Sequence, residues 1–342
     1  MTMSLVKAPS NLPALVSAAF AQARASNDLT FFPTQAAVLS TAYGPVQLRY
    51  APSLAHKPKG PPRAAGSPPI DPFADPPAPL RIATLAPAHI LVLNKFAIAP
   101  EHFILATSAW RSQEDVLEEA DIAAAHACVQ AYRGQEGGNT GDTATGPGTQ
   151  DSPPVCHTGL FVFFNGGPHS GASQPHCHLQ LIPVSSLHDG LPAAPAWVPL
   201  IDSILCATSG APGLPCRVFA QPIPAGASGK ELFETYLALY AQACRAVLGE
   251  GVEVPREGRA LVSYNFAMTE STMAVCPRVA EGAEICVQNG QGKLQLNGTL
   301  LAGTALVKSE SEWDALRQDP RLFENVLSKI GVPKENEVAE KN

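Results

Sequence analysis

The chain of 342 residues carries 23 Lys and Arg against 30 Asp and Glu, which gives a formal net charge of −7. This acidic balance excludes a general nucleic-acid binder, because such a protein needs a basic face that displaces counterions from phosphates; a local basic pocket for a small anion stays open. No stretch reaches the roughly 18 apolar residues of a membrane span, and no basic start is followed by an apolar run. We therefore expect a protein of the cytoplasm, with the nucleus also open, whose eight scattered cysteines are free thiols.

The first hundred residues predict one helix followed by strands. Residues 11–25 (NLPALVSAAFAQARA) have the apolar spacing of an amphipathic helix, and residues 44–52 alternate as a strand does. A proline-rich connection follows at residues 58–80, because proline interrupts regular structure. Residues 89–100 (HILVLNKFAIAP) are apolar enough to form a buried strand.

A second helix is predicted at residues 112–132. Ser112 is a suitable N-cap, and Glu114 and Asp115 would place negative charge in the first turn. Residues 133–154 follow, and their Gly, Thr, Asp and Pro content leaves almost no apolar side chain to bury. We expect this segment to be a flexible loop.

The rest of the chain predicts antiparallel sheet with one clear helix. Residues 159–165 (GLFVFFN) form a strongly apolar strand, and a glycine-rich turn leads from it to a second strand at residues 176–184. Residues 229–250 have apolar side chains at helical spacing, namely Phe233, Tyr236, Tyr240, Ala243 and Val247. Short strands and turns follow to the C-terminus. The mixture favours an α+β fold over alternating βαβ units.

The most informative pattern is the run H-x-H-x-Q in the second of these strands. Because side chains alternate between the two faces of a strand, His176, His178 and Gln180 share one face. The other face carries Cys177, Leu179 and Leu181. Three polar groups backed by three apolar ones predict the wall of a site resting on a core, whereas a purely structural histidine would explain one such residue and not the row.

A turn of small and polar residues lies directly before the histidines. Consecutive main-chain N–H groups in such a turn can converge on an anion, and glycine lets the main chain approach closely. The turn consists of Gly171, Ala172, Ser173 and Gln174, of which the last two add side-chain donors. Beside two histidines, it predicts phosphate binding next to a nucleophile.

A metal site is the competing interpretation of this stretch. His169, His176, His178 and Cys177 are all potential zinc ligands. On a strand, however, the cysteine faces away from the histidines, which leaves too few ligands on one side. We therefore expect no tightly bound metal, whereas Mg2+ can accompany a polyphosphate because it needs few protein ligands.

The motif and its flanks resemble a known family. HCHLQ is similar to the histidine-triad signature in its transferase form, in which glutamine replaces the third histidine. The longer run SGASQPHCHLQLIP resembles the diadenosine tetraphosphate phosphorylases, also called ATP adenylyltransferases. Further similar segments occur in the same order: RYAPSLAHKP (49–58), DPF (71–73), LVLNKFAIAPEHFILAT (91–107), SYNFAMT (263–269) and LAGTALVK (301–308). The resemblance covers most of the chain, whereas the galactose-1-phosphate uridylyltransferases share the short core and not its flanks.

The resemblance implies a histidine-triad-like antiparallel sheet flanked by helices, with a C-terminal extension packed on it. It implies an N-terminal catalytic domain at residues 1–200 and a C-terminal adenylyltransferase domain at residues 213–335 that completes the substrate site. We expect the protein to be a monomer.

A covalent route is implied as well. His178 would attack the α-phosphorus of diadenosine tetraphosphate and displace ATP, and inorganic phosphate would then attack the nucleotidyl-histidine and leave as ADP. A hydrogen bond from the other ring nitrogen of His178 to the main-chain carbonyl of His176 would orient the ring, and Gln180 would hydrogen-bond the α-phosphate. Glutamine cannot take a proton, which fits transfer to phosphate rather than water. Adenosine phosphosulfate is implied as a side substrate.

Other positions of the family's substrate site match residues from both halves of the chain. The turn at residues 171–174 would cradle the polyphosphate, and lysines would neutralise its charge. The matching residues outside that turn are Lys57, Asn94, Lys95, Asn165, Asn297, Gly298, Thr299, Thr304 and Lys308. A solvated surface role stays open for Lys57 and Lys308, and a turn-forming role for Asn94.

Two positions depart from the family pattern. Cys177 replaces the basic residue of many relatives and Thr304 the methionine of some, so base preference is left open.

Three functions are compatible with the sequence. The first function is reversible phosphorolysis of diadenosine tetraphosphate to ATP and ADP. The second is a histidine-triad hydrolase or a hexose-1-phosphate uridylyltransferase, which a phosphate-dependence assay separates from the first. The third is a non-catalytic nucleotide sensor, against which the intact histidine motif weighs. His169 and His188 receive no role.

Overall fold

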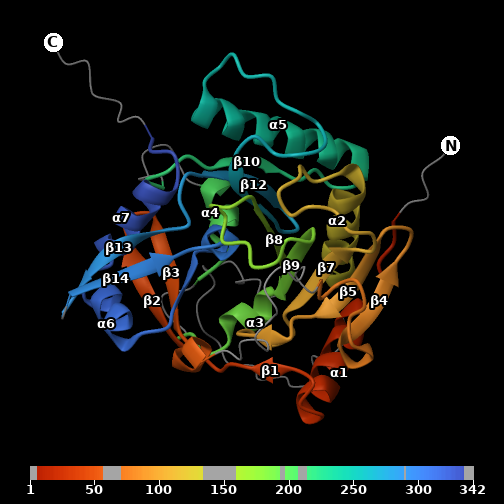
Figure 1. The fold of residues 1–342 in the computed structure, drawn as a ribbon, viewed down its shortest axis with the longest axis horizontal. Coiled ribbons are helices and arrows are strands. Elements are labelled where there is room, and N and C mark those ends of the chain that lie inside the picture. The colour runs from red at the N-terminus through yellow and green to blue at the C-terminus, as the bar shows by residue number, and fades with distance from the viewer. Residues whose placement is uncertain are drawn as a thin grey trace, which may run out of the picture.

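An eight-stranded antiparallel sheet forms the centre of the molecule (Figure 1). The computed structural model describes residues 6–56, 71–133, 159–192, 197–206, 214–288 and 290–334. In spatial order the strands of the sheet are β10 (Phe219–Pro222), β12 (Thr272–Arg278), β11 (Ser263–Met268), β8 (Leu160–Gly166), β9 (His178–Pro183), β7 (Phe103–Thr107), β5 (His89–Leu93) and β4 (Arg81–Leu85). All neighbouring pairs in it are antiparallel. The predicted α+β fold is confirmed.

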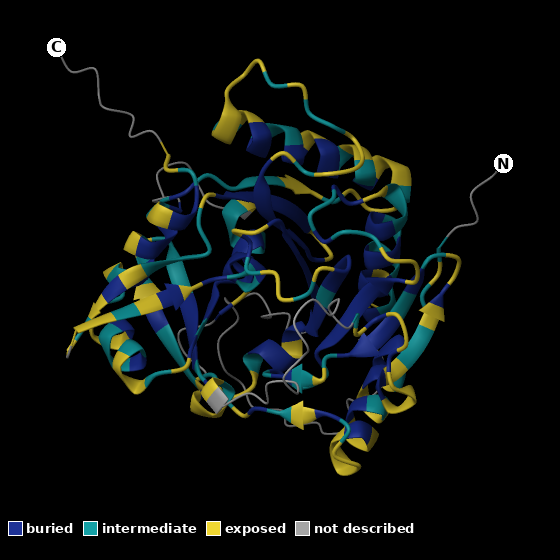
Figure 2. Cartoon of the chain, in the orientation of Figure 1, coloured by how far each residue is buried: buried dark blue, intermediate teal, exposed yellow. Residues whose placement is uncertain are grey.

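Strand β8 shows why the sheet is covered on both faces. Leu160, Val162 and Phe164 pack into one hydrophobic cluster, and Phe161 and Phe163 pack into another on the opposite face. All five side chains are buried, and Figure 2 shows the same dark burial along the neighbouring strands. Burying each aromatic ring contributes on the order of 1.5–3 kcal/mol, so this strand anchors both layers of the fold.

Three helices cover the first of these faces. They are α1 (Leu12–Ala25), α2 (Glu119–Arg133) and α5 (Gly229–Leu248). The first and the third confirm helices predicted from the sequence. Helix α5 begins with a reciprocal capping box, in which the side chains of Ser228 and Glu231 each accept from the main-chain N–H of the other. Tyr236 is fully buried on it, whereas Val247 is exposed, so the apolar stripe ends before the helix does.

The predicted start of the second helix is wrong. Helix α2 begins at Glu119 and not at Ser112. The hydroxyl of Ser112 accepts from the main-chain N–H of Glu114 at 3.1 Å, which closes a turn and caps no helix. Ser112 also forms an antiparallel bridge with His176. Because its main chain pairs with the histidine segment, this stretch cannot also form the first turn of a helix.

A second layer covers the opposite face and brings strands from residues 35–50 together with the C-terminal end of the described chain. A three-stranded sheet has the order β15 (Thr304–Val307), β3 (Gly44–Tyr50) and β2 (Gln35–Thr41), with β15 parallel to β3. Around it lie helices α3 (Val184–His188), α4 (Leu200–Cys206), α6 (Glu310–Gln318) and α7 (Arg321–Ile330), and the hairpin β13 (Gly282–Val287) with β14 (Gly290–Gln295). The smaller elements are β1 (Thr30–Phe31) paired with β6 (Phe96–Ala97), and the 3-10 helices η1 (Pro52–His56), η2 (Ala78–Leu80) and η3 (Gly298–Ala302).

The central sheet crosses the boundary between the two predicted domains. Strands β10, β11 and β12 come from residues 213–335, and the other five come from residues 1–200. The junction is the pairing of β11 with β8, where Asn265 lies opposite Asn165. The two halves therefore share one sheet, and any site at this junction is built from both.

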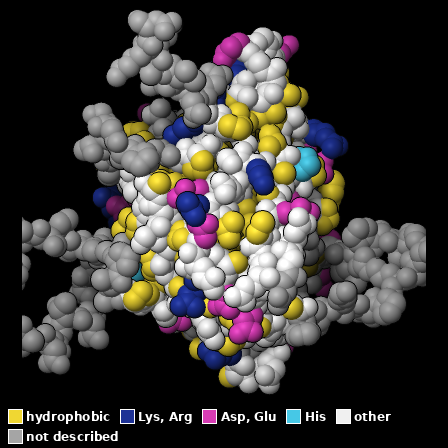
Figure 3. Space-filling view, turned by 90° about the vertical axis from the view of Figure 1, so that its left-hand side faces the viewer, with side chains coloured by type: hydrophobic (Ala, Val, Ile, Leu, Met, Phe, Trp, Pro, Cys, Tyr) yellow, Lys and Arg dark blue, Asp and Glu magenta, His cyan; other side chains and the backbone are white. Residues whose placement is uncertain are grey.

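The surface and the cysteines agree with the composition. On the face that carries α6 and α7, basic and acidic side chains lie intermingled (Figure 3). Among the described residues, no helix is long and apolar enough to cross a membrane. The six cysteines whose side chains the structure describes are free thiols, as predicted, and all but Cys286 are buried.

Candidate active site

His178 is the first residue of β9 and lies in the interior of the central sheet. Its Nδ1–H donates to the main-chain carbonyl of His176 at 2.8 Å, which is the orienting contact predicted from the sequence. Because a carbonyl oxygen can only accept, this bond fixes the ring proton on Nδ1. The lone pair of the neutral ring is then on Nε2, the nitrogen available to attack a substrate.

Burial keeps this imidazole neutral. It lowers the pKa of His178 to about 4; the hydrogen bond to the main chain of His176 opposes the shift and the His176 ring reinforces it. The ring of Phe73 lies against the His178 ring, with 5.1 Å between the centroids. Neutral imidazole is the nucleophilic form, so His178 is in its reactive state at pH 7.

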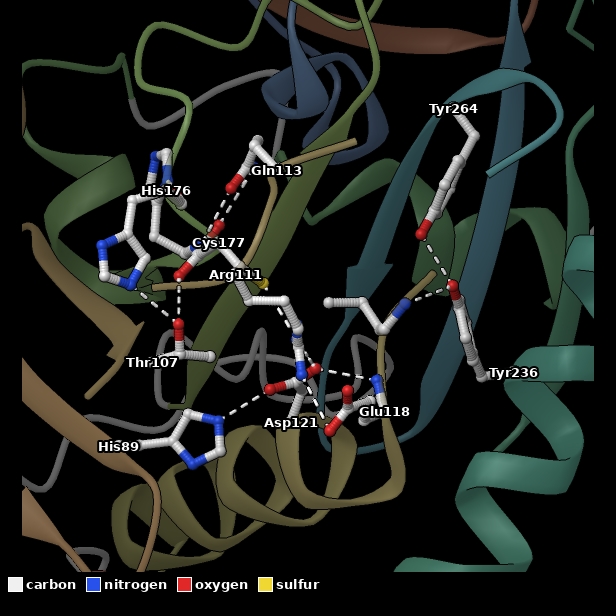
Figure 4. Close-up of polar contacts among 12 residues, drawn as sticks. His89, Thr107, Arg111, Gln113, Glu118, Asp121, His176, Cys177, Tyr236 and Tyr264 are labelled. Carbon is white, nitrogen blue, oxygen red and sulfur yellow. Dashed lines mark hydrogen bonds and ion pairs between the residues drawn. The ribbon is translucent and has the colours of Figure 1, made fainter. Parts of the chain in front are cut away.

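His176 supports the ring of His178 and is itself held at both ring nitrogens. Its Nδ1 lies 2.7 Å from Oδ2 of Asp71, and its Nε2 lies 2.8 Å from Oγ1 of Thr107 (Figure 4 shows the second contact). The residue is 1% exposed. Both nitrogens are engaged, so the ring fixes the carbonyl that orients His178. Sequence reasoning missed Asp71 and Thr107, although both lie in segments that resemble the family.

Gln180 and Asn94 meet at a buried histidine that sequence reasoning also missed. His102 hydrogen-bonds the side chain of Gln180, and Nδ2 of Asn94 lies 3.2 Å from its Nδ1. Burial lowers the pKa of His102 to about 4, against the hydrogen bond that the ring donates to Gln180 and together with the nearby His178. Asn94 Oδ1 accepts from the main-chain N–H of Phe96 at 3.0 Å, which is the turn-forming role left open above.

The predicted phosphate turn packs against the C-terminal half of the chain. Gly171 has a φ of +82°, and an added Cβ would lie 2.7 Å from Cβ of Asn297. A side chain would be strained here by both the backbone and the neighbour, which explains the glycine. Ala172 and Ser173 are exposed and Gln174 is half-buried. The outer side of the turn is therefore open to solvent.

Asn165 joins the two halves of the chain beside this turn. It is 2% exposed, and its Oδ1 accepts from the main-chain N–H of Gly298 at 2.7 Å and from the side chain of Asn265 at 2.9 Å. Asn265 also donates to the carbonyl of Ser170 at 2.9 Å. The side-chain oxygen of Asn165 thus joins the two halves, and the predicted contact of this residue with substrate stays a prediction.

The C-terminal candidates gather at η3 and at the strand that follows it. Asn297 caps η3, because its Oδ1 accepts from the main-chain N–H and from the hydroxyl of Thr299 at 3.0 and 2.8 Å. The Thr299 hydroxyl also lies 3.1 Å from the carbonyl of Thr304. Thr304 is buried, and its hydroxyl has no hydrogen-bond partner in the part of the chain that the structure describes.

The predicted lysines lie at the periphery. Lys95 is exposed between β5 and β6, and Lys308 is exposed where β15 ends. Lys57 lies outside the described residues. Charge neutralisation by these three lysines therefore stays a prediction.

The opposite face of the histidine segment carries a buried network of charged groups (Figure 4). Arg111 lies 3.0 Å from Sγ of Cys177 and pairs with Glu118 at 3.0 Å and with Asp121, whose Oδ1 lies 2.7 Å from Nε2 of His89. Burial raises the pKa of the Cys177 thiol to about 12, so it stays protonated. Cys177 faces away from His176 and His178, as predicted. Across the described ranges, no three His, Cys, Asp or Glu side chains converge as metal ligands would.

Comparisons with known proteins agree with this geometry. A family model of the Ap4A phosphorylase N-terminal domain matches residues 2–150 and 156–200, and one of the ATP adenylyltransferase C-terminal domain matches residues 212–333. Diadenosine 5',5'''-P1,P4-tetraphosphate phosphorylase 2 of Saccharomyces cerevisiae is 29% identical over 295 residues, which cover 83% of this chain and 82% of that one. The crystal structure of yeast Ap4A phosphorylase Apa2 in complex with Ap4A shares the fold, with a TM-score of 0.73 at 24% identity over 95% of this chain and 98% of that chain. Because the N-terminal model alone matches more than half of the sequence, this chain belongs to the Ap4A phosphorylase family of nucleotidyltransferases.

Proposed function

We propose that this chain cleaves diadenosine tetraphosphate with inorganic phosphate to ATP and ADP, through a nucleotidyl-His178 intermediate. The observation that carries the proposal is the His178 ring, which is buried and neutral, with Nδ1 held by a carbonyl and Nε2 left to attack. The curated yeast relative is named for phosphorolysis of this substrate, and solved structures of Apa2 contain Ap4A or AMP. These relatives support adenosine polyphosphates as the substrate class.

The first step transfers the nucleotide to the protein. Nε2 of His178 forms a bond to the α-phosphorus while the bond from that phosphorus to the bridging oxygen breaks, and ATP leaves with the electron pair. The ring becomes an imidazolium whose Nδ1–H still donates to the carbonyl of His176, and a charged donor makes that hydrogen bond stronger. The protein contributes a fixed direction of attack, which is a large part of catalysis in phosphoryl and nucleotidyl transfer.

The second step returns the protein to its starting state. An oxygen of inorganic phosphate attacks the same phosphorus, the phosphorus–nitrogen bond breaks, and ADP leaves. Burial disfavours a positive charge on this ring, so departure of His178 as neutral imidazole is favoured. The covalent adduct is therefore reactive and does not become a trap.

The surrounding residues would bind the polyphosphate. We propose that Gln180, held from behind by His102, contacts the α-phosphate. The turn at residues 171–174 would offer main-chain N–H groups to the phosphates that leave as ATP. Magnesium would arrive on the polyphosphate and neutralise part of its charge, since this ion keeps several waters and needs few protein ligands.

The test separates the covalent route from its alternatives. The protein is incubated with labelled diadenosine tetraphosphate without phosphate, and mass spectrometry locates the nucleotide adduct. We expect AMP on His178, and release of ADP when phosphate is added. Formation of AMP without phosphate would identify a hydrolase, binding without turnover would identify a sensor, and an adduct on another residue would refute the assignment of His178.

A further inference from the structure

Gln113 lies against the main chain of the nucleophile with both ends of its side-chain amide engaged. Its Oε1 accepts from the main-chain N–H of His178 at 2.8 Å. Its Nε2 donates to two main-chain carbonyls, of His178 at 3.2 Å and of Asn165 at 2.8 Å. The residue is 2% exposed, and Figure 4 shows its side chain pointing at the histidine segment. One buried amide thus serves three main-chain groups of the site.

These contacts lie where one residue pair, or rung, of the sheet does not form its main-chain hydrogen bonds. Strands β8 and β9 pair as far as Phe164 opposite Leu179. The next rung would place Asn165 opposite His178, but the amide of Gln113 occupies that position. On their outer edges both strands stay paired at these same two residues, β8 with β11 and β9 with β7. The separation is therefore confined to the edge that carries the nucleophile.

The segment that carries Gln113 is fixed by the same stretch of chain. The main-chain N–H of Gln113 donates to the carbonyl of Pro175 at 2.8 Å, and that of Cys177 donates to the carbonyl of Arg111 at 2.8 Å. The Arg111 side chain is anchored in turn by the buried carboxylate of Asp121. These two bonds form a short main-chain ladder, and the side chain of Gln113 extends it by accepting from the main-chain N–H of the next residue, His178.

We propose that Gln113 is a positioning residue, which holds β9 apart from β8 at His178 and so sets where Nε2 of that histidine stands relative to the phosphorus. This inference rests on the function proposed above. Without the amide, three buried main-chain groups lose their partner, and they can regain one by closing the rung between His178 and Asn165. Closure moves the nucleophile toward β8, whereas the turn at residues 171–174 and η3 keep their place.

The kinetic signature follows from that displacement. In-line attack needs the reacting atoms at about 3–3.5 Å, and a shift of about 1 Å lowers the rate about 100-fold. Groups that bind the nucleotide without touching Gln113 are unaffected. We therefore expect a loss in the rate of adduct formation and little change in affinity.

The experiment compares Gln113→Met, which keeps the length of the side chain and removes its hydrogen bonds, with Tyr236→Phe. Tyr236 is fully buried, and its hydroxyl accepts from the main-chain N–H of Leu117 at 3.1 Å and lies 2.6 Å from the hydroxyl of Tyr264. Its variant therefore also removes buried hydrogen bonds but lies outside the site. Both variants are expected to have a lower Tm. In single turnovers without phosphate, Gln113→Met should form the His178 adduct about 100-fold more slowly, with the Kd for AMP within about threefold of the parent, and Tyr236→Phe should form it at about the parental rate.

A second readout does not depend on turnover. Nitrogen-15 NMR of the His178 ring reports its tautomer and its titration. The parent ring should hold its proton on Nδ1 and stay neutral from pH 8 to pH 5, because its pKa is about 4; in Gln113→Met the ring should stay neutral while its nitrogen resonances shift, because the ring moves relative to Phe73 and to the carbonyl of His176. Equal adduct rates in the two variants, a Kd that rises in step with the rate loss, or unchanged His178 ring resonances would overturn the role of Gln113. If the parent forms no adduct at all, the proposed function is refuted, and the NMR comparison alone tests whether Gln113 positions His178.

Discussion

The two faces of the segment that carries His176 and His178 surround buried histidines with different partners. The face of His178 is called the front, and the face of Cys177 is called the back. On the front, His178 donates to a main-chain carbonyl, and burial lowers its pKa to about 4. On the back, His89 lies 2.7 Å from the carboxylate of Asp121, and burial, which opposes ionisation of that carboxyl, is outweighed by His89 and Arg111, which lower its pKa. On the front, the carbonyl orients the imidazole without offering it a full negative charge, so it does not outweigh the effect of burial on the His178 pKa.

The front therefore carries the groups that we propose to react, and the back carries groups that stabilise the fold. The front keeps its histidine neutral and therefore nucleophilic, whereas the back binds Arg111 and Asp121 as an ion pair beneath the same residues. Changes on the front should lower the rate and spare the fold. Changes on the back should destabilise the fold and spare the rate.

The largest expected effect is on the front, in His178→Ala. Removing the proposed nucleophile should lower adduct formation and phosphorolysis more than about 1000-fold, because the other residues of a covalent mechanism cannot act without it. AMP binding should stay within a few-fold of the parent, and calorimetric titration with AMP supplies that control. Normal turnover by this variant would show that the front histidine is not the nucleophile.

The next effect is on the back, in Asp121→Asn. Loss of the carboxylate leaves the largely buried Arg111 without its buried counter-charge, which should cost about 3–5 kcal/mol of unfolding free energy. Glu118→Gln is the matched control, since Glu118 contacts the same guanidinium but its side chain is 54% exposed, and an exposed pair contributes no more than about 1 kcal/mol. Urea unfolding measures both variants. Equal costs would mean that burial of the carboxylate does not set the strength of this network.

The pH dependence of stability and of adduct formation tests directly whether His178 is neutral. Folding lowers the pKa of His178 and of His102 from 6.5 to about 4. The stability that depends on these neutral rings is therefore complete above pH 6.5 and is lost as the pH falls from 6.5 to 4. With a pKa of about 4, roughly nine-tenths of the His178 rings stay neutral at pH 5, whereas an ordinary histidine would keep only about 3%.

Single-turnover adduct formation between pH 7.5 and pH 5 measures this difference. We expect the rate constant to fall less than about twofold over that range, once it is corrected for the folded fraction from circular dichroism. A tenfold fall per pH unit below pH 6.5 would show that the front histidine ionises as it does in water.

The sequence predicted the front of the site better than its supports. The alternation of a strand placed His178 and Cys177 on opposite faces, and the structure confirms both that and the bond from His178 to the carbonyl of His176. These are local relations, set within a few residues by strand geometry. The buried strand at residues 159–165 was likewise visible in its apolar run.

The supports lie far away along the chain and leave no periodic signal. Asp71 stands 105 residues before His176, and Gln113 stands 65 residues before His178. Gln113 was hidden further by a misassigned helix, since the acids after Ser112 imitate a helical first turn. A substrate contact of Asn165 stays a prediction, whereas the hydrogen bond from the main-chain N–H of Gly298 to its side-chain oxygen was not predicted. Such partners depend on tertiary contacts, which pattern and propensity do not encode.

The smallest effect that sharpens the comparison concerns Gln180, the front residue that cannot accept a proton. Gln180→His places a base beside the adduct, so hydrolysis should rise relative to phosphorolysis by a few-fold, which is less than the roughly 100-fold or more that a well-positioned general base provides. The ratio of AMP to ADP, measured by chromatography at fixed phosphate, reports it. His102→Asn is the control, because it changes the partner of Gln180 without adding a base there. If both variants keep the parental product ratio, the choice between phosphate and water is made by access to the adduct, and the glutamine serves to bind the α-phosphate.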